Sequence, residues 1–374
     1  MDPLRHVKPA VRGIAAYTLA LREAPVKINQ NENPWDLEDA VKRRVIETAL
    51  ARPWSRYPDF DPKELLAALA RFSGWREDGV LAGNGSNELI EALLLVTVGA
   101  GTRVVIPAPT FTLYALMTTI LGGEPVRVPL RPASADPAAG LAYDVEAISA
   151  ARRESNASVT IVCSPNNPTG NALALADVER LCDESDSLVV IDEAYHEFSG
   201  ETVVPLLARH PNLVVLRTFS KAMALAGLRV GYLLASPELV REINKARLPY
   251  NLNFFSQAAA IAALEETAAL EASVARLVRE RERVLAVLAS MPGVRAWPSR
   301  ANFFVLELLE GTDPKAVFSS MLRRGVLVRD VTSYPMLGRC LRVSVGSEAE
   351  NEAFLGALGT ALGEAGAVFQ AGRA

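Results

Sequence analysis

The sequence predicts an α/β fold: a large domain built on a doubly wound, mostly parallel sheet, followed by a smaller α+β domain. First, its 374 residues are too many for one ordinary domain and enough for two. Second, short apolar runs alternate with helical segments between about residues 41 and 260, and this alternation implies a parallel sheet covered on both faces. Third, the alternation ends after Ser256, where a long segment rich in Ala, Leu, Glu and Arg begins.

The elements are expected in the following order along the chain. A loop-rich arm, residues 1–44, crosses over the large domain and belongs to the small one. The large domain, residues 45–260, has helical segments such as 177–182 and 205–208 between buried strands at 104–106, 159–162, 188–191 and 213–216. The small domain, residues 261–374, continues one long helix over 257–291 with strands at 303–306 and 341–345 and a final helix from Glu348.

Composition and charge exclude several classes of protein. Half of the residues are hydrophobic and 22% are charged, which is typical of a globular chain with an ample core. The net charge is −4 and the basic residues are spread along the chain, so we expect no nucleic-acid or membrane partner. The most apolar stretch, 89–109, is interrupted by Glu91 and Arg103, which argues against a membrane span, and residues 1–6 lack the apolar core of a secretory signal.

The three cysteines, Cys163, Cys182 and Cys340, are scattered and lack metal-ligand spacing. With only three histidines in the chain, this pattern argues against a disulfide framework and against a zinc site. We therefore predict no metal and a reducing, cytoplasmic location.

Ligands of doubly wound sheets bind beyond the carboxyl ends of the strands, so residues that follow the predicted strands are candidate site residues. Lys221 follows the run 213–216 among small residues. Burial disfavours the ammonium form of such a lysine and makes its amine available for imine chemistry. Thr218, Ser220 and Arg229 in the same segment could together hold a phosphate. The alternative is a surface lysine that starts a helix.

Asp192 follows the run 188–191 and could pair with the protonated nitrogen of a pyridine ring, or could simply cap a helix. Tyr195 and Asn167 could donate hydrogen bonds to an oxygen on the same ring, although the prolines around Asn167 are also ordinary turn chemistry. Phe111 could stack on the flat ring, but a phenylalanine is more often a core residue.

The segment 83–88, Gly-Asn-Gly-Ser-Asn-Glu, precedes an amphipathic helical run. Gly85 permits close backbone approach, and Ser86 and Asn87 stand where free amides at a helix start could bind a phosphate. Plain helix capping is the alternative. The segment differs from a dinucleotide-binding fingerprint, because Glu88 replaces the last glycine and no apolar strand clearly leads into it.

Arg329 and Arg342 lie within apolar, strand-like runs of the small domain. An arginine there must pair with an anion or extend to water, so an anionic substrate group and a structural carboxylate are both candidate partners. Tyr57, in Arg-Tyr-Pro-Asp, has only a turn interpretation from the residues alone.

Taken together, these segments provide a phosphate cup, an amine for an aldehyde, a partner for a ring nitrogen, donors to a ring oxygen and a stacking ring. Pyridoxal phosphate is the cofactor that needs this whole set at once. If each segment had only its alternative structural role, all of these segments would have come together in one domain by coincidence.

The blocks GNGSNELIEAL, SPNNPTG, VVIDEAYHEF and TFSKAMALAGLR resemble the signature blocks of class I/II aminotransferases over essentially the full length. The resemblance implies the fold-type I architecture of pyridoxal-phosphate enzymes. Within that class, QNENP, RYPD, LPYNLN, VLVRD and LRVSVG are most similar to those of histidinol-phosphate aminotransferases. Phosphothreonine decarboxylases and some aromatic aminotransferases share most of these blocks.

The resemblance implies a role for each residue. Lys221 would hold the cofactor as a Schiff base and shuttle the proton at the substrate carbon; Asp192 would bind the ring nitrogen, and Asn167 and Tyr195 the ring oxygen. The cofactor phosphate would be bound by Gly85, Ser86, Asn87, Ser220 and Arg229, with Phe111 on the ring face. Tyr57 would reach the cofactor phosphate of the neighbouring subunit, which implies a homodimer with shared sites. The substrate's anionic end would be held by Arg329 and Arg342, with Tyr17 and Asn33 of the arm closing over it.

The resemblance thus predicts transamination between L-histidinol phosphate and 2-oxoglutarate by a ping-pong mechanism. Two alternatives use the same cofactor: decarboxylation of an O-phosphoamino acid, and transamination of aromatic amino acids. A third, a cofactor-sensing transcription regulator, would need an amino-terminal DNA-binding module, and the arm contains no basic recognition helix.

Overall fold

The computed structural model describes residues 2–15 and 22–371. Its central element is a seven-stranded sheet with the order β2-β10-β9-β8-β7-β3-β4. Only β10 is antiparallel to its neighbours, and the other strands run parallel to one another. The strands in that order are β2 (Val80–Gly83), β10 (Gly231–Leu234), β9 (Leu213–Thr218), β8 (Leu188–Asp192), β7 (Val159–Cys163), β3 (Arg103–Ala108) and β4 (Glu124–Pro129). The predicted mostly parallel sheet and its four predicted strands are confirmed.

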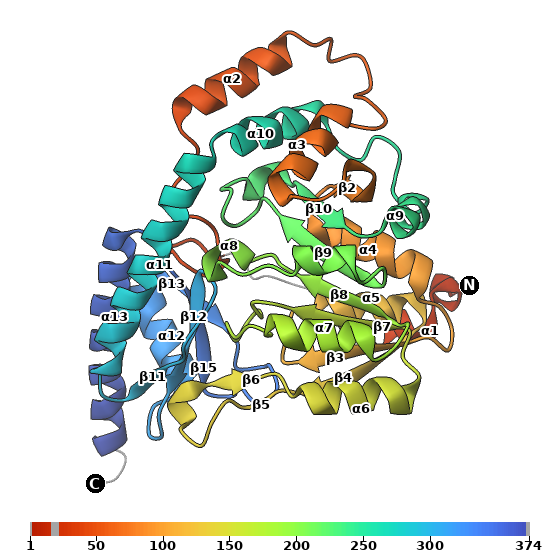
Figure 1. Ribbon diagram of the computed structural model, residues 1–374. Helices are drawn as coiled ribbons and strands as arrows, with labels where there is room; N and C mark the ends of the chain where they lie inside the picture. Colours follow the sequence, from red (N-terminus) through yellow and green to blue (C-terminus); the bar gives the residue numbers. More distant parts are fainter. Residues whose placement is uncertain (1, 16–21, 372–374) are drawn as a thin grey trace.

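The strands of this sheet are apolar throughout because both of their faces are covered. Successive residues of β7, such as Ile161 and Val162, belong to two different core clusters, one on each face of the sheet. One face packs against α4 (Ser86–Thr97), α5 (Leu113–Leu121) and α9 (Pro237–Asn244). The other packs against α3 (Lys63–Ser73), α6 (Val145–Ser155), α7 (Leu175–Asp183) and α10 (Phe254–Glu265), and α2 (Asp39–Leu50) lies outside on α10 (Figure 1).

A smaller, antiparallel sheet follows in the second half of the chain, with the order β11-β12-β15-β14. Its strands are β11 (Val294–Ala296), β12 (Phe303–Leu308), β15 (Cys340–Ser344) and β14 (Arg329–Asp330). Helices α11 (Thr267–Ala289), α12 (Pro314–Arg323) and α13 (Glu348–Ala371) pack around it (Figure 1). The arm contributes β1 (Val26–Lys27), which pairs in parallel with β13 (Val326–Leu327) in a separate two-stranded sheet. The amide of Ser344 in β15 donates to the carbonyl of Ile28, so the arm is fixed beside the smaller sheet.

The remaining elements are short. They are α1 (Pro9–Arg12), β5 (Arg131–Pro132), β6 (Leu141–Ala142) and α8 (His196–Ser199), with 3-10 turns at Pro3–His6, Glu77–Gly79, Pro137–Ala139, Val204–Ala208 and Ala226–Leu228. The segment 205–208, predicted to be helical, is thus a 3-10 helix.

The structure corrects two expectations about secondary structure. The single helix expected over 257–291 is two helices, since Glu266 leaves helical geometry with φ −98° and ψ 41° between α10 and α11. A single non-helical residue does not change the helical composition of the segment, so the sequence did not indicate the break. The change of direction at Glu266 lets α10 pack on the large sheet while α11 follows the small one (Figure 1). An apolar strand, β2, does lead into the 83–88 segment; its four residues include Ala and Gly, which favour strands weakly.

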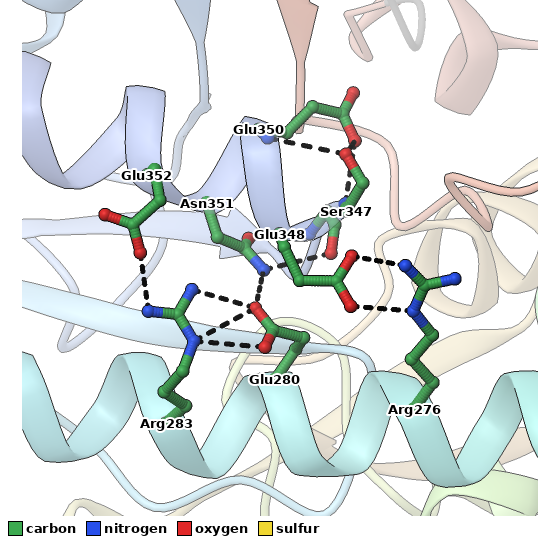
Figure 2. A network of polar contacts seen from close by, with 9 residues as sticks. Arg276, Glu280, Arg283, Ser347, Glu348, Glu350, Asn351 and Glu352 are labelled. Carbon is green, nitrogen blue, oxygen red and sulfur yellow. Dashed lines mark hydrogen bonds and ion pairs between the residues drawn. The ribbon is translucent and has the colours of Figure 1, made fainter.

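A polar network fastens α13 to α11 (Figure 2). Arg276 forms two hydrogen bonds with Glu348, at 2.7 and 2.6 Å, and its guanidinium lies 4.2 Å from the centre of the Trp35 ring of the arm. Asn351 bonds Glu280 as well as the backbone of Gly346. The turn that follows β15 is therefore fixed to both α11 and the arm.

Within residues 2–15 and 22–371, no helix is long and apolar enough to cross a bilayer. The same described residues contain no group of three metal-ligating side chains.

Candidate active site

A cavity of about 280 Å³ lies at the carboxyl ends of the central strands, between the large sheet and the smaller one. The end of β7, at Cys163, is level with Asp192 of β8, which in turn pairs with Leu216 of β9. Most of the residues predicted for the site line this cavity: Ser86, Asn87, Phe111, Asn167, Asp192, Tyr195, Thr218, Ser220, Lys221, Arg229, Arg329 and Arg342.

One end of the cavity is suited to a phosphate. Helix α4 begins at Ser86 after Gly85, and no side chain caps it, so its first amides remain available. The predicted capping alternative is therefore not found. Arg229 donates a 2.9 Å hydrogen bond to the hydroxyl of Ser220, which lies 3.1 Å from the hydroxyl of Thr218. Two hydroxyls, an arginine and a helix start thus converge at one place.

Gly85 is needed for this arrangement. Its φ of +79° is a conformation that side chains rarely adopt. A Cβ atom there would lie 2.5 Å from a terminal nitrogen of Arg229, so any larger residue would displace the guanidinium. The sequence folds the chain so that the backbone itself makes room for an anion beside Arg229.

Asp192 lies at the bottom of the cavity, with 3% of its surface exposed. Its carboxylate accepts hydrogen bonds from the Tyr114 hydroxyl at 2.6 Å and from the amide of Ala194 at 3.1 Å. Burial raises the pKa of Asp192 to about 6, and the two hydrogen bonds oppose that rise. A cationic partner, such as the protonated nitrogen of a pyridine ring, would stabilise the ionised form of this buried carboxylate.

Lys221 follows β9 in a turn rather than a helix, which removes the surface-helix alternative. Its Nζ donates a 2.8 Å hydrogen bond to the carbonyl of Gln30. Burial, with a smaller contribution from the positive charge of Arg342, lowers the pKa of Lys221 to about 7. The amine is therefore substantially neutral near physiological pH, as a nucleophile that condenses with an aldehyde must be.

This pKa is measurable, because only the neutral amine reacts with acetic anhydride. In the cofactor-free protein, we expect labelling of Lys221, followed by peptide mass spectrometry, to be half-maximal near pH 7 and to fall as the pH is lowered through that value. Lys42 is an internal control, since its ion pair with Asp36 raises its pKa and should delay its labelling to far higher pH. Coincident labelling profiles for the two lysines would contradict the depressed pKa.

Tyr195, Asn167 and Phe111 surround the space between Asp192 and the small sheet. Tyr195 is buried, and burial raises the pKa of its hydroxyl, which keeps it a proton donor. Phe111 is only partly buried and packs edge-on against Tyr114, with 5.6 Å between the ring centres. A flat aromatic ring bound above Asp192 would thus have an aromatic wall and two polar groups beside it.

Arg329 and Arg342 face each other across paired positions of β14 and β15 at the cavity. Arg342 is held by the Asn167 side chain at 2.5 Å and by the carbonyl of Asn29 at 2.7 Å. Within the part of the chain that the structure describes, the side chain of Arg329 forms no hydrogen bond or ion pair, although its backbone pairs with Arg342. Two guanidinium groups at one wall favour an anionic ligand.

Two predicted site residues lie elsewhere, and a third is outside the described part of the chain. Tyr57 is 80% exposed and stacks on Tyr250, with 4.5 Å between ring centres, outside this cavity. Asn33 borders two neighbouring hollows and donates to the carbonyl of Ala222, beside Lys221. Tyr17 lies outside the described residues. The roles of these three residues stay predictions.

The structure also brings in residues that the sequence analysis did not select. Tyr114 was hidden because a tyrosine on the inner face of a helix has the pattern of a core residue, yet it bonds Asp192. Asn29, Gln30 and Asn31 line the cavity. In the sequence, the QNENP block at 30–34 pointed toward this stretch, and it gave no indication of which asparagine enters the site.

Comparisons with known proteins agree with this geometry. The chain is 38% identical to a histidinol-phosphate aminotransferase of Chlorobium phaeovibrioides over 96% of this chain and 97% of the relative. A relative of the same name from Desulfitobacterium hafniense is 36% identical over 95% and 97%. The crystal structure of histidinol-phosphate aminotransferase from Sinorhizobium meliloti, in complex with pyridoxal-5'-phosphate, superimposes with a TM-score of 0.85 at 26% identity, covering 96% of this chain and 98% of that one. The family model described as aminotransferase class I and II matches residues 23–358, and the chain belongs to that family.

Proposed function

We propose that this protein is a pyridoxal-phosphate-dependent histidinol-phosphate aminotransferase of histidine biosynthesis, which moves an amino group between L-histidinol phosphate and 2-oxoglutarate. The observation that carries the proposal is the placement of two arginines, Arg329 and Arg342, on the wall of a cavity that also contains the neutral amine of Lys221. Relatives of that name are 36% and 38% identical over nearly the whole chain.

The cofactor, when bound, supplies an aldehyde and an electron-withdrawing ring. Its phosphate fits the start of α4 with Ser220 and Arg229, where Gly85 leaves room for an anion. Asp192 would hold the ring nitrogen in its protonated state. Phe111 would cover one face of the ring.

The chain's own groups provide the proton transfer. Lys221 is the residue that would hold the cofactor, and its amine would carry the proton to and from the substrate carbon. Its depressed pKa of about 7 suits an amine that must both accept and release a proton near neutral pH. Tyr195 and Asn167 would hold the ring oxygen.

The two arginines account for both half-reactions. Arg342 is already oriented by Asn167 and Asn29, so it presents its charge at a fixed place. Arg329, on the neighbouring strand, widens the basic wall. A phosphate ester and a dicarboxylate can bind this wall in turn, as a ping-pong exchange requires.

We also propose that the protein is a cytoplasmic homodimer with shared active sites. Trp54, Tyr57 and Leu248 are each more than 60% exposed, and Tyr57 stacks on Tyr250, two residues after Leu248. Exposed apolar patches mark interaction surfaces. A second copy would cover them and bring Tyr57 to the cofactor phosphate of the neighbouring subunit. Sedimentation equilibrium should give twice the 40.2 kDa chain mass, and a monomer at micromolar concentration would contradict the shared site.

A substrate panel tests the function. With 2-oxoglutarate as acceptor, we expect kcat/KM for L-histidinol phosphate to exceed that for phenylalanine or aspartate by about 100-fold, because buried polar groups left unpaired discriminate strongly against substrates without their partner. L-Histidinol, which lacks only the phosphate, is the matched control and should lose a similar factor. Equal turnover of phenylalanine would support an aromatic aminotransferase, and carbon dioxide released from an O-phosphoamino acid without 2-oxoglutarate would support the decarboxylase.

A further inference from the structure

Three consecutive residues of the arm run through the site, and each bonds a different member of it. The bonds join Asn29 to Arg342, Gln30 to Lys221, and Asn31 to Tyr195. The first two use backbone carbonyls, which any residue type would supply. The third uses a side chain, so here the identity of the residue matters.

The orientation of the Asn31 amide follows from its partners. The backbone amide of Asn31 donates to the hydroxyl oxygen of Ser344 at 2.8 Å, which leaves that hydroxyl's single proton for another acceptor. The side-chain oxygen of Asn31 lies 2.9 Å from the same hydroxyl and accepts that proton. The side-chain nitrogen must therefore face the other way, where it donates to the Tyr195 hydroxyl at 3.0 Å.

The backbone of Asn31 is held as firmly as its side chain. Only 1% of the residue is exposed, and its carbonyl accepts a 3.0 Å hydrogen bond from the side chain of Asn302. Its φ of 56° is left-handed, a conformation that asparagine tolerates better than most residues. Asn31 is thus a rigid donor aimed at one atom.

This donor determines where the proton of Tyr195 points. A phenol has one proton, and the oxygen of Tyr195 already accepts a hydrogen bond from Asn31. Among the residues that the structure describes, no group accepts the Tyr195 proton, and the side chain lines the cavity. The proton is therefore directed into the cavity, toward whatever acceptor binds there.

The charges near Tyr195 leave this proton in place. Burial raises the pKa of the hydroxyl, while the positive charge of Arg342 opposes the rise and Cys163 and Asp192 add to it. The Nζ of Lys221 lies 5.9 Å from the centre of the tyrosine ring. The hydroxyl consequently stays protonated over the working pH range.

We infer that Asn31 is a positioning residue: its amide fixes the hydroxyl of Tyr195 so that the tyrosine proton is donated to the ring oxygen of the cofactor. The inference rests on the proposed function for the cofactor, but not for the substrate. It assigns to the arm a part in tuning the cofactor in addition to covering it.

The pH-dependent absorption of the bound cofactor, without substrate, tests this role. A hydrogen bond donated to the ring oxygen stabilises the deprotonated form of the cofactor and so lowers the pKa of the cofactor's ionisable proton. Losing the donor should therefore raise the pH at the midpoint of the absorption change. In Asn31→Asp, a carboxylate of the same shape accepts the tyrosine proton and turns it away. We expect an upward shift of about one pH unit, the size of one hydrogen bond to a charged group.

Asn31→Gly keeps the left-handed backbone and adds no charge, so it should give a smaller upward shift. In a Tyr195→Phe background the same substitution should give no further shift, because Asn31 acts through the tyrosine hydroxyl. Asn302→Ala is the matched control: it removes a bond to the Asn31 backbone alone and should leave the midpoint unchanged. Thermal melts identify any variant that fails to fold. If Asn31→Asp does not fold, the shift in Asn31→Gly tests the inference.

Two results would overturn the inference. One is a wild-type midpoint in folded, yellow Asn31→Asp and Asn31→Gly proteins, and the other is an undiminished shift of Asn31→Gly in the Tyr195→Phe background. A protein that fails to take up the cofactor would contradict this inference and the proposed function together. Failure to use histidinol phosphate, with the shifts present, would contradict the proposed function alone.

Discussion

Lys221→Ala is expected to lower kcat by about 10⁴-fold or more, the upper end of what a positioned acid–base group contributes. In the proposed mechanism, the substitution removes both the residue that holds the cofactor and the group that moves the proton at the substrate carbon. Among the described residues, its amine donates a hydrogen bond to the backbone carbonyl of Gln30, so the substitution removes a single hydrogen bond from the fold. The variant should therefore remain folded.

The measurement combines turnover with borohydride reduction. Wild-type protein should be yellow, and reduction should leave a cofactor adduct on the peptide that contains Lys221. The variant should bind the cofactor without forming that adduct, and its thermal midpoint should stay close to that of the wild type. Lys315→Ala, at an exposed position outside the site, is the control and should retain full activity. Turnover within tenfold of wild type in Lys221→Ala would remove the basis of the proposed mechanism.

Asp192→Asn is expected to reduce kcat/KM by about 10²–10⁴-fold, because loss of one partner of a buried charged pair costs roughly 3–5 kcal/mol. The amide keeps the shape of the carboxylate but carries no charge, so the ring nitrogen loses the anion that keeps it protonated. The pKa of about 6 means that Asp192 is mostly ionised at pH 7.5 even without a cationic partner. The wild-type protein therefore presents a charge that the variant lacks.

Tyr114→Phe separates charge from hydrogen bonding. It removes the 2.6 Å bond to Asp192 and leaves the carboxylate in place. We expect kcat/KM to fall only about tenfold. A hydrogen bond to a charged group contributes roughly 1.5–3 kcal/mol, and this loss is divided between cofactor binding and turnover. The affinity for the cofactor, measured by titration of the cofactor-free proteins, should fall further in Asp192→Asn than in Tyr114→Phe. The reverse order would argue that Asp192 holds no positive charge.

The fold and the cofactor end of the site could be predicted because their signals are local. Buried parallel strands have continuous apolar runs, and in this fold the residues that follow them meet at one edge of the sheet. Asp192, Asn167 and Lys221 each follow such a run within five residues, so the strand pattern alone brought them together. The β2 strand was missed because four residues ending in Ala-Gly carry little strand signal.

The amino-acid sequence by itself determined the alternation of strands and helices, and with it most of the residues that line the cavity. Tertiary structure alone decided how the arm meets the site: the bonds of Asn31 to Tyr195 and of Asn29 to Arg342 span 164 and 313 residues of chain. Periodicity and capping act over a few residues, whereas the direction of a hydroxyl proton depends on which groups packing places around it. For that reason the QNENP block, from which the resemblance selected Asn33, gave no sign that Asn31 lies against Tyr195.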